Sequence, residues 1–213
     1  MSNDELPDTQ VDRVDWVIRA PTNEEMRRRY DIWASVYDKD VGSVDDYLAP
    51  LELAKVAKEF LEPSMRIVDA GAGTGLVGEA LKAQGFDNLT ALDFSAQMLE
   101  VARGKDIYRE LHECDLSKQT ALKADYADAL VSCGTTTQVP CESLREYARL
   151  VCPGGKIVFA AVQGTWDDYG YGKIFAELEG EGALRIVYKG APFQMMPTTE
   201  PQFICEIWVM EVG

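Results

Sequence analysis

A glycine-rich loop between an apolar run and a helical pattern is the first stretch of the chain whose residue types and spacing could do chemistry. In VDAGAGTGLVGEAL, Gly71, Gly73 and Gly75 follow Asp69 at alternate positions. Glycines let a backbone approach a ligand closely, and a helix start offers unpaired N–H groups to a polar group. The dinucleotide fingerprint GxGxxG would need a third glycine where Leu76 stands. A carboxylate at position 69 would repel a pyrophosphate, whereas it suits a ligand that carries an ammonium group.

Two further acids stand where neighbouring strands are expected to end. Asp93 lies about 20 residues beyond the glycine loop, the separation at which an acid contacts ribose hydroxyls. It could also be a turn residue before a helix, but Ser95 already suits the helix cap, so we favour the ribose role. Asp115 could accept a hydrogen bond from an adenine amino group, and it could equally form a turn before a helix.

The elements that must position these residues alternate regularly along the chain. Strands are expected at 65–70, 89–93, 107–114, 126–132 and 156–162, and helices at 74–84, 96–103, 118–124 and 142–151. This alternation predicts a Rossmann-like α/β fold, a three-layer sandwich with helices on both faces of a parallel sheet. Ligands of such sheets bind beyond the carboxyl ends of the strands.

The C-terminal part of the chain follows a different pattern. After a helix at 171–180, strands at 183–189 and 203–210 are joined by a proline-containing loop without a helix, which predicts an antiparallel hairpin. The sheet should therefore have seven strands, most of them parallel. The stretch TWDDYGYG (165–172) is rich in aromatic residues and glycines, and it could be a substrate lid or an ordinary loop.

The N-terminal part is expected to contain a tail and two helices. Residues 1–21 predict a mobile acidic tail, and residues 22–213 predict a single domain. A helix should begin near residue 22, and a second, over about 45–61, should begin in effect near Pro50. In the first helix, Tyr30, Trp33 and Tyr37 recur at helical spacing. Such a stripe could close a pocket or simply pack in a core.

Composition narrows the function classes. The 213 residues carry a formal net charge of -15, which disfavours a nucleic-acid partner. No apolar run approaches the roughly 20 residues that span a bilayer. The five cysteines are odd in number and form no CxxC pair, which favours a reducing, cytoplasmic location. The single histidine, His112, falls on an expected edge strand, so neither a metal site nor a histidine base is expected.

Four motifs together are similar to those of a known family. VDAGAGTG, ALD (91–93), CDL (114–116) and PGG (153–155) resemble the motifs of class I methyltransferases that use S-adenosyl-L-methionine. The likeness runs from about residue 30 to residue 159. YDIWASVYDKDV (30–41) and GTTTQVPCESL (134–144) further resemble the Williams-Beuren syndrome region methyltransferase-like proteins, whose acceptor the likeness does not supply.

This resemblance implies a function and a set of site residues. The cofactor would be S-adenosyl-L-methionine, the product S-adenosyl-L-homocysteine, and N-terminal helices would cap the cofactor pocket. The implied cofactor-binding residues are Tyr30, Trp33, Tyr37, Asp69, Gly71, Ala72, Gly73, Asp93, Phe94, Met98, Asp115, Leu116 and Cys133. Cys133 could equally be a packing residue. Tyr37 is the candidate catalytic residue, ahead of Asp38, Asp40, Gln138, Trp166, Asp167 and Tyr171.

Three functional hypotheses follow. The first is methyl transfer to a small-molecule acceptor by in-line displacement, in a monomer or homodimer. The second is an NAD-dependent oxidoreductase, which the acid at position 69 and the missing glycine count against. The third is a non-catalytic protein that binds S-adenosyl-L-methionine and stabilises a partner. Aminopropyl transfer is weaker still, because the sequence offers no paired acidic site for a polyamine.

Overall fold

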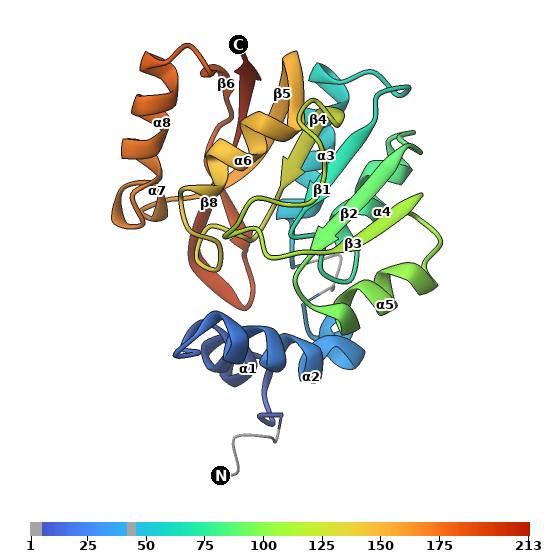
Figure 1. Ribbon diagram of the computed structural model, residues 1–213. Coiled ribbons are helices and arrows are strands. Elements are labelled where there is room, and N and C mark those ends of the chain that lie inside the picture. The colour runs from blue at the N-terminus through green and yellow to red at the C-terminus, as the bar shows by residue number, and fades with distance from the viewer. Residues whose placement is uncertain (1–5, 42–45) are drawn as a thin grey trace.

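The computed structural model describes residues 6–41 and 46–213, which form one eight-stranded sheet with helices on both faces (Figure 1). The strand order is β3-β2-β1-β4-β5-β8-β6, and β7 pairs with β8. The strands are β1 (Ile67–Ala70), β2 (Leu89–Asp93), β3 (Glu110–Glu113), β4 (Ala127–Ser132), β5 (Val151–Val162), β6 (Leu184–Lys189), β7 (Phe193–Met196) and β8 (Glu200–Val212). The helices are α1 (Gln10–Ile18), α2 (Asn23–Val41), α3 (Ala49–Phe60), α4 (Leu76–Ala83), α5 (Ala96–Gly104), α6 (Ser143–Leu150), α7 (Thr165–Asp168) and α8 (Tyr171–Gly180).

The first five strands form the parallel part of the sheet. The pairs β3-β2, β2-β1, β1-β4 and β4-β5 are all parallel. Every residue of β1 and β2 is buried, as expected of central strands covered on both faces. The Rossmann-like three-layer α/β sandwich expected from the alternating pattern is therefore confirmed. The helix expected at 118–124 does not form, and this connection consists of turns.

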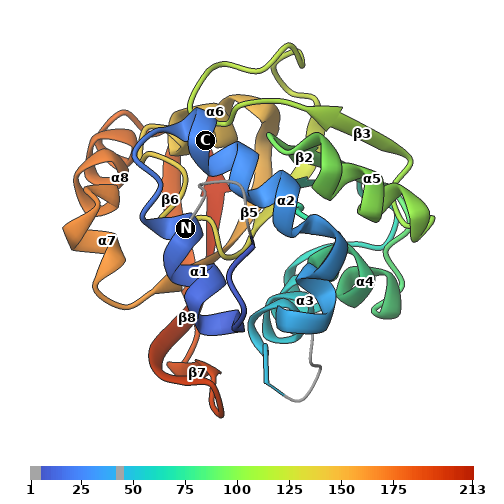
Figure 2. The same cartoon turned by 90° about the horizontal axis from the view of Figure 1, so that it is seen from below.

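The two faces of the sheet bury separate apolar cores. One core packs α3, α4 and α5 against the sheet through residues such as Leu53, Leu81 and Leu99. The other packs α6 and α8 against the opposite face through residues such as Tyr147 and Phe175. The view from below separates these two groups of helices and shows α1 and α2 lying across the end of the sheet (Figure 2).

The antiparallel end of the sheet has one strand more than expected. β8 lies between β5 and β6 and is antiparallel to both, which confirms the C-terminal hairpin. The segment expected to be a long loop contains β7, which also pairs with β8, so the count of seven strands was one too low. β7 has only four residues and lies between Pro192 and Pro197, so it leaves little alternating pattern in the sequence.

The expected mobile tail is partly a helix. α1 begins at the N-cap Thr9, whose side chain accepts from the Asp12 N–H, and its Val17 is buried against α2. Arg13 forms a short ion pair with Asp40 of α2. The expectation of a mobile tail is therefore wrong for the helix at 10–18; residues 1–5 and 42–45 lie outside the described residues. Within the described parts of the chain, no helix is both long and apolar enough to span a bilayer.

Candidate functional site

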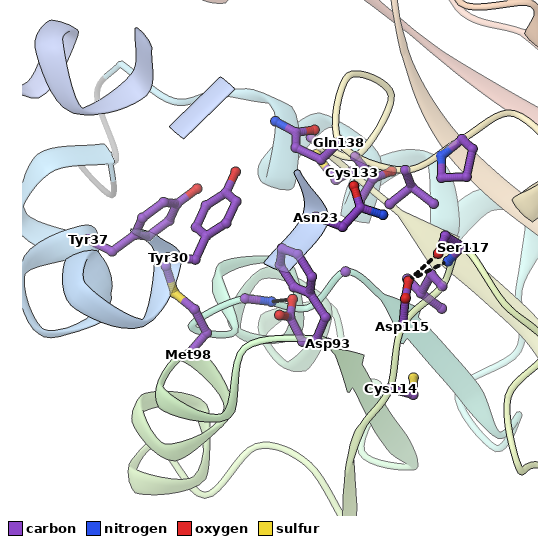
Figure 3. Close-up of a pocket in the computed structure, with 18 of the residues that line it drawn as sticks. Asn23, Tyr30, Tyr37, Asp93, Met98, Cys114, Asp115, Ser117, Cys133 and Gln138 are labelled. Carbon is purple, nitrogen blue, oxygen red and sulfur yellow. Dashed lines mark hydrogen bonds between the residues drawn. The ribbon is translucent and has the colours of Figure 1, made fainter. Parts of the chain in front are cut away.

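The ends of four parallel strands open onto one cavity, here called the acidic cavity (Figure 3). Its volume is about 730 Å³ with its open mouth included, a size suited to a cofactor or a small ligand. Strand ends contribute Gly71 and Gly73 after β1, Asp93 at the end of β2, Cys114, Asp115 and Leu116 after β3, and Cys133, Gly134 and Thr135 after β4. Asn23, Tyr30 and Tyr37 of α2 line the other side. The cavity therefore lies where ligands of parallel α/β sheets bind.

The glycine loop leaves room for a ligand at one of its positions. Gly71 and Gly73 have φ values of +79° and +53°, which few side chains tolerate. A Cβ added at Gly71 would lie 2.3 Å from Thr135 Cγ2, whereas one added at Gly73 would meet nothing within 4 Å. Gly71 is therefore required for the fit against the loop after β4, and Gly73 borders open space in the cavity.

Asp93 is a buried carboxylate held by backbone groups. Its Oδ2 accepts from the Gly73 N–H at 2.8 Å, and its Oδ1 accepts from the Ser95 N–H at 2.9 Å. Burial raises the pKa of Asp93 to about 6, against the lowering effect of these hydrogen bonds. The side chain thus serves both as a turn residue and as an acceptor facing the cavity, since each carboxylate oxygen can take a second hydrogen bond.

Asp69 lies outside the cavity lining and is fully buried. Its Oδ2 accepts from the Tyr108 hydroxyl at 2.6 Å, while its Oδ1 has no partner among the described residues. Burial raises the pKa of Asp69 to about 7, although the Tyr108 hydrogen bond opposes the shift. A Cβ at Gly78 would lie 2.3 Å from the Tyr108 hydroxyl, so only glycine in α4 admits this tyrosine. The first β strand therefore ends in an incompletely satisfied acid.

Asp115 forms the turn that the sequence allowed, and it also lines the cavity. It forms a turn, because its Oδ1 accepts from both the N–H and the hydroxyl of Ser117, at 2.9 Å and 2.5 Å. It also lines the cavity and forms an ion pair with Lys118 at 2.9 Å. Burial would raise the pKa of this carboxyl, but hydrogen bonds from Ser117 and Lys118 outweigh it and lower the pKa.

Helix α2 is fixed over the cavity by two acids. Asp31 Oδ1 accepts from the Ser95 hydroxyl, at 2.6 Å, at the start of α5. Asp38 accepts from the hydroxyl of Thr74 in the glycine loop, and it forms an ion pair with Lys105 at 2.6 Å. Tyr30 and Tyr37, each of which immediately precedes one of these acids along the helix, line the cavity. The N-terminal helix α2 thus caps the pocket, as expected.

Three tyrosines line the cavity as neutral phenols. Burial raises the pKa of Tyr30, Tyr37 and Tyr47, and the charges of nearby acidic groups such as Asp93 and Cys133 raise it further. Tyr47 is also hydrogen-bonded to Cys133, with its hydroxyl 3.7 Å from the sulfur. At neutral pH these hydroxyls are hydrogen-bond donors and not phenolates. The raised pKa of Tyr37 therefore argues against its acting as a general base.

Ten of the thirteen implied cofactor-binding residues line the acidic cavity, and three do not. Asp69 is buried as described, and Ala72 is part of the core beneath the loop. Trp33 turns away from the cavity, and its Nε1 donates to Asp40 at 2.6 Å. Helical spacing places Trp33 next to Tyr30 and Tyr37 on the helix. It does not determine which of these side chains face the cavity.

Several lining residues were not expected from the sequence, and others that were considered lie elsewhere. The unexpected ones are Asn23, Tyr47, Ser117, Gly134, Thr135, Val139 and Pro140. The loop after β4 holds four of these seven, and in the sequence its GTTTQVP run indicates only a family resemblance. Gln138, considered for the acceptor, does line the cavity.

The stretch 165–172 does not cover the cavity. It begins with the short helix α7, and Trp166 packs against Trp208, with ring centroids 4.3 Å apart, and beside Phe159 and Tyr171. The interpretation as an ordinary loop with anchoring rings therefore fits better than a lid. His112 lies on the edge strand β3, where its Nε2 is 3.1 Å from Glu110, away from the cavity.

Comparisons with known proteins agree with this geometry. Residues 68–159 match the family model described as a methyltransferase domain. The human methyltransferase-like protein 27 is 35% identical over 134 residues, which are 60% of this chain and 54% of that protein. The chloroplastic 2-methyl-6-phytyl-1,4-hydroquinone methyltransferase of Arabidopsis thaliana is 34% identical over 122 residues, 53% of this chain and 32% of that protein. The chain thus spans about half of the first relative and a third of the second.

Solved structures share the same architecture. In the complex between the Haloferax volcanii Trm112 methyltransferase activator and the putative methyltransferase, the matching chain has a TM-score of 0.65 and 20% identity, covering 88% of this chain and 97% of that one. Such a likeness supports the fold alone. With the strand-end cavity, these comparisons show that residues 68–159 match a methyltransferase domain and that the chain shares the Rossmann-like fold of the solved methyltransferase chain.

Proposed function

We propose that this protein transfers a methyl group from S-adenosyl-L-methionine to a small-molecule acceptor. The observation that carries the proposal is the convergence of the glycine loop, Asp93, Asp115 and two α2 tyrosines on one cavity at the carboxyl ends of the strands. The matched methyltransferase domain contains the first three of these features. The family and the fold imply the cofactor, while the activity of the whole chain is the proposal.

The residues present fit this cofactor. Asp69 Oδ1 is a buried oxygen that has no hydrogen-bond partner among the described residues, and such a carboxylate oxygen favours the arrival of a cation such as an ammonium group. Gly73 borders space that a Cβ would otherwise fill. Asp69 and the glycine loop would hold the amino-acid end, Asp93 the ribose, and Asp115 with Leu116 the adenine. Because Asp69 is outside the lining, its effect would be electrostatic or relayed by water.

The main role of the chain's own residues would be to orient the acceptor. The cofactor supplies an activated methyl group on a sulfonium, so in-line displacement needs positioning and exclusion of water above all. The nucleophilic atom of the acceptor bonds to the methyl carbon as the carbon–sulfur bond breaks, leaving S-adenosyl-L-homocysteine. Tyr37 would donate a hydrogen bond that orients the acceptor, and the acceptor's proton would leave to solvent.

A small-molecule acceptor is favoured by charge and by relatives. The net charge of -15 disfavours nucleic acid. One relative is named for a hydroquinone, and several bacterial relatives, 25–28% identical, are named ubiquinone biosynthesis O-methyltransferases. Both names describe acceptors that are small molecules. We propose a monomer or homodimer in the cytoplasm, a location that the five free cysteines suit.

The test has a binding arm and a turnover arm. Isothermal titration should show that S-adenosyl-L-homocysteine binds and that NADH does not. Incubation with methyl-labelled S-adenosyl-L-methionine and a metabolite extract should then transfer label to a small molecule identified by mass spectrometry. Tyr37→Phe should lower turnover while leaving cofactor affinity within about threefold.

Each alternative has its own outcome. Binding of NADH without binding of S-adenosyl-L-homocysteine would replace the proposal with an oxidoreductase. Tight binding of the cofactor with no labelled product from any extract would favour a non-catalytic partner protein. A labelled protein or nucleic acid, with no labelled small molecule, would overturn the acceptor class.

A further inference from the structure

A second cavity adjoins the acidic cavity and is lined mainly by apolar side chains. It has a volume of about 910 Å³ with its open mouth included, and α1, α2, β7 and β8 contribute its walls. We call it the apolar cavity, and its characteristic lining residues are Val11, Val14, Trp33, Met195, Met196 and Phe203. None of these residues lines the acidic cavity.

The two cavities meet at a shared wall. Tyr30, Tyr37 and Tyr47 line both, together with Gly134 and Gln138. The close-up shows Tyr30 and Tyr37 side by side on the α2 side of the acidic cavity, with Gln138 across from them (Figure 3). A molecule in the apolar cavity would therefore contact three tyrosines at the boundary with the acidic cavity.

The apolar cavity offers little to a charged ligand. Among its described lining residues, Glu200 is the only carboxylate, and there is no lysine, arginine or histidine. A carboxylate or phosphate on the ligand would lose its hydration without gaining a counter-charge. An ammonium would find Glu200 alone, and Gln202 already donates a hydrogen bond to that carboxylate. Uncharged apolar surface is the ligand character that this lining matches.

Exposed apolar residues on α1 point to a ligand as well. Three large apolar side chains are exposed among the described residues: Val11 at 51%, Ile18 at 38% and Tyr169 at 49%. Val11 and Ile18 both lie on α1 and both line the apolar cavity. A ligand that covers them would remove apolar surface from water, which is favourable. The exposure is therefore concentrated where an apolar molecule would enter.

We propose that the apolar cavity is the acceptor site and that the acceptor is an uncharged, largely apolar molecule with a hydroxyl group that reaches Tyr30, Tyr37 and Tyr47. This inference rests on the proposed function, because it takes the acidic cavity as the cofactor site. It adds the chemical class of the acceptor and the role of α1 and of the β7–β8 region in selecting it.

The experiment compares three naphthalene probes of similar shape and different charge. 1-Naphthol, 1-naphthoate and 1-naphthylmethylamine are titrated calorimetrically into protein saturated with S-adenosyl-L-homocysteine at pH 7. We expect 1-naphthol to bind at least tenfold more tightly than either charged probe. Equal or tighter binding of the carboxylate or the amine would overturn the proposal.

A matched pair of variants locates the probe. Val11→Glu places a charge in the wall of the apolar cavity at a position exposed enough to tolerate it, and it should weaken 1-naphthol binding about tenfold. Tyr169→Glu makes the same change at a similarly exposed residue that lines neither cavity, and it should leave binding unchanged. Equal effects of the two variants, or no effect of Val11→Glu, would overturn the proposal.

Two controls separate the possible failures. The affinity for S-adenosyl-L-homocysteine is measured first in each variant and should not change; if the wild type fails to bind it, the proposed function fails while the probe titration still tests the apolar cavity. Light scattering reports the oligomeric state. If Val11→Glu dissociates an oligomer and leaves 1-naphthol affinity unchanged, the exposed face of α1 is an interface between copies and the inference fails.

Discussion

The acidic cavity and the apolar cavity share a wall but are built in opposite ways. The acidic cavity is formed by the ends of four consecutive parallel strands, and its acids are held by backbone hydrogen bonds. The apolar cavity is formed by segments from both ends of the sequence, α1 near residue 10 and β8 near residue 203. The acidic cavity is therefore fixed by the central sheet itself, whereas the apolar cavity depends on how elements distant in the sequence pack against one another.

The largest effect is expected from removing the carboxylate of Asp93 in the acidic cavity. Asp93→Ala should weaken S-adenosyl-L-homocysteine binding roughly 100-fold, about 3 kcal/mol, because two hydrogen bonds to a charged acceptor are lost. Calorimetric titration measures this effect. Asp87→Ala, an exposed acid outside both cavities, is the control. A change below threefold in folded Asp93→Ala protein would show that this acid does not hold the ligand.

The second prediction concerns pH and the buried acid Asp69. Burial raises its folded-state pKa from 3.8 to about 7, so the folded state binds more protons than the unfolded state between these values. The folded state therefore loses stability through this group as pH rises from about 4 to 7. Asp69→Asn cannot titrate, so the variant does not lose this stability as pH rises. The free energy of unfolding of the variant minus that of the wild type should therefore be about 2 kcal/mol larger at pH 8 than at pH 5.

Urea unfolding of the ligand-free protein at the two pH values measures this difference. Any constant cost of the buried amide cancels in it, because the same amide is present at both pH values. Asp87→Asn, with an exposed side chain, is the control. A difference that is the same at pH 5 and pH 8 would mean that Asp69 is not titrating in this range.

The smallest effect concerns the wall of the apolar cavity. Arg13 is largely buried and ties α1 to Asp40 of α2, so Arg13→Ala should raise hydrogen exchange in the α1 amides about tenfold, or about 1.4 kcal/mol. Arg19 pairs with Asp15 on the same helix at an exposed position, and Arg19→Ala should change exchange less than twofold. Exchange in β1 should not change in either variant. Equal effects of the two variants would contradict a specific attachment of α1.

The sequence predicts the acidic cavity much better than the apolar cavity. Asp93, Asp115 and the glycine loop could be predicted because each follows a strand within a few residues, and parallel strands bring their ends together. Tyr30, Trp33 and Tyr37 were implied by the family resemblance, and of these Trp33 lines only the apolar cavity. Which aromatic side chains of a helix face a cavity depends on what packs against each side of the helix. Here α1 packs against the side on which Trp33 lies.

The apolar cavity was not predictable in the same way. Met195 and Met196 reach it because β7 pairs with β8 and because Asp46 accepts hydrogen bonds from Thr198 and Thr199. The hydrogen bonds to Asp46 join residues about 150 positions apart, and no local pattern encodes them. α1 was missed because the segment around it was judged by its acidic composition, although Val11, Val14, Val17 and Ile18 recur in it at helical spacing.

The fit of Tyr108 against Gly78 has an evolutionary consequence. The tyrosine hydroxyl would lie 2.3 Å from any Cβ at position 78, and its hydrogen bond to Asp69 depends on that gap. Substitutions at these three positions are therefore not independent. In an alignment of related sequences, we expect a residue larger than glycine at position 78 only where the residue at position 108 is smaller than tyrosine. In those sequences we also expect position 69 to have lost its acid.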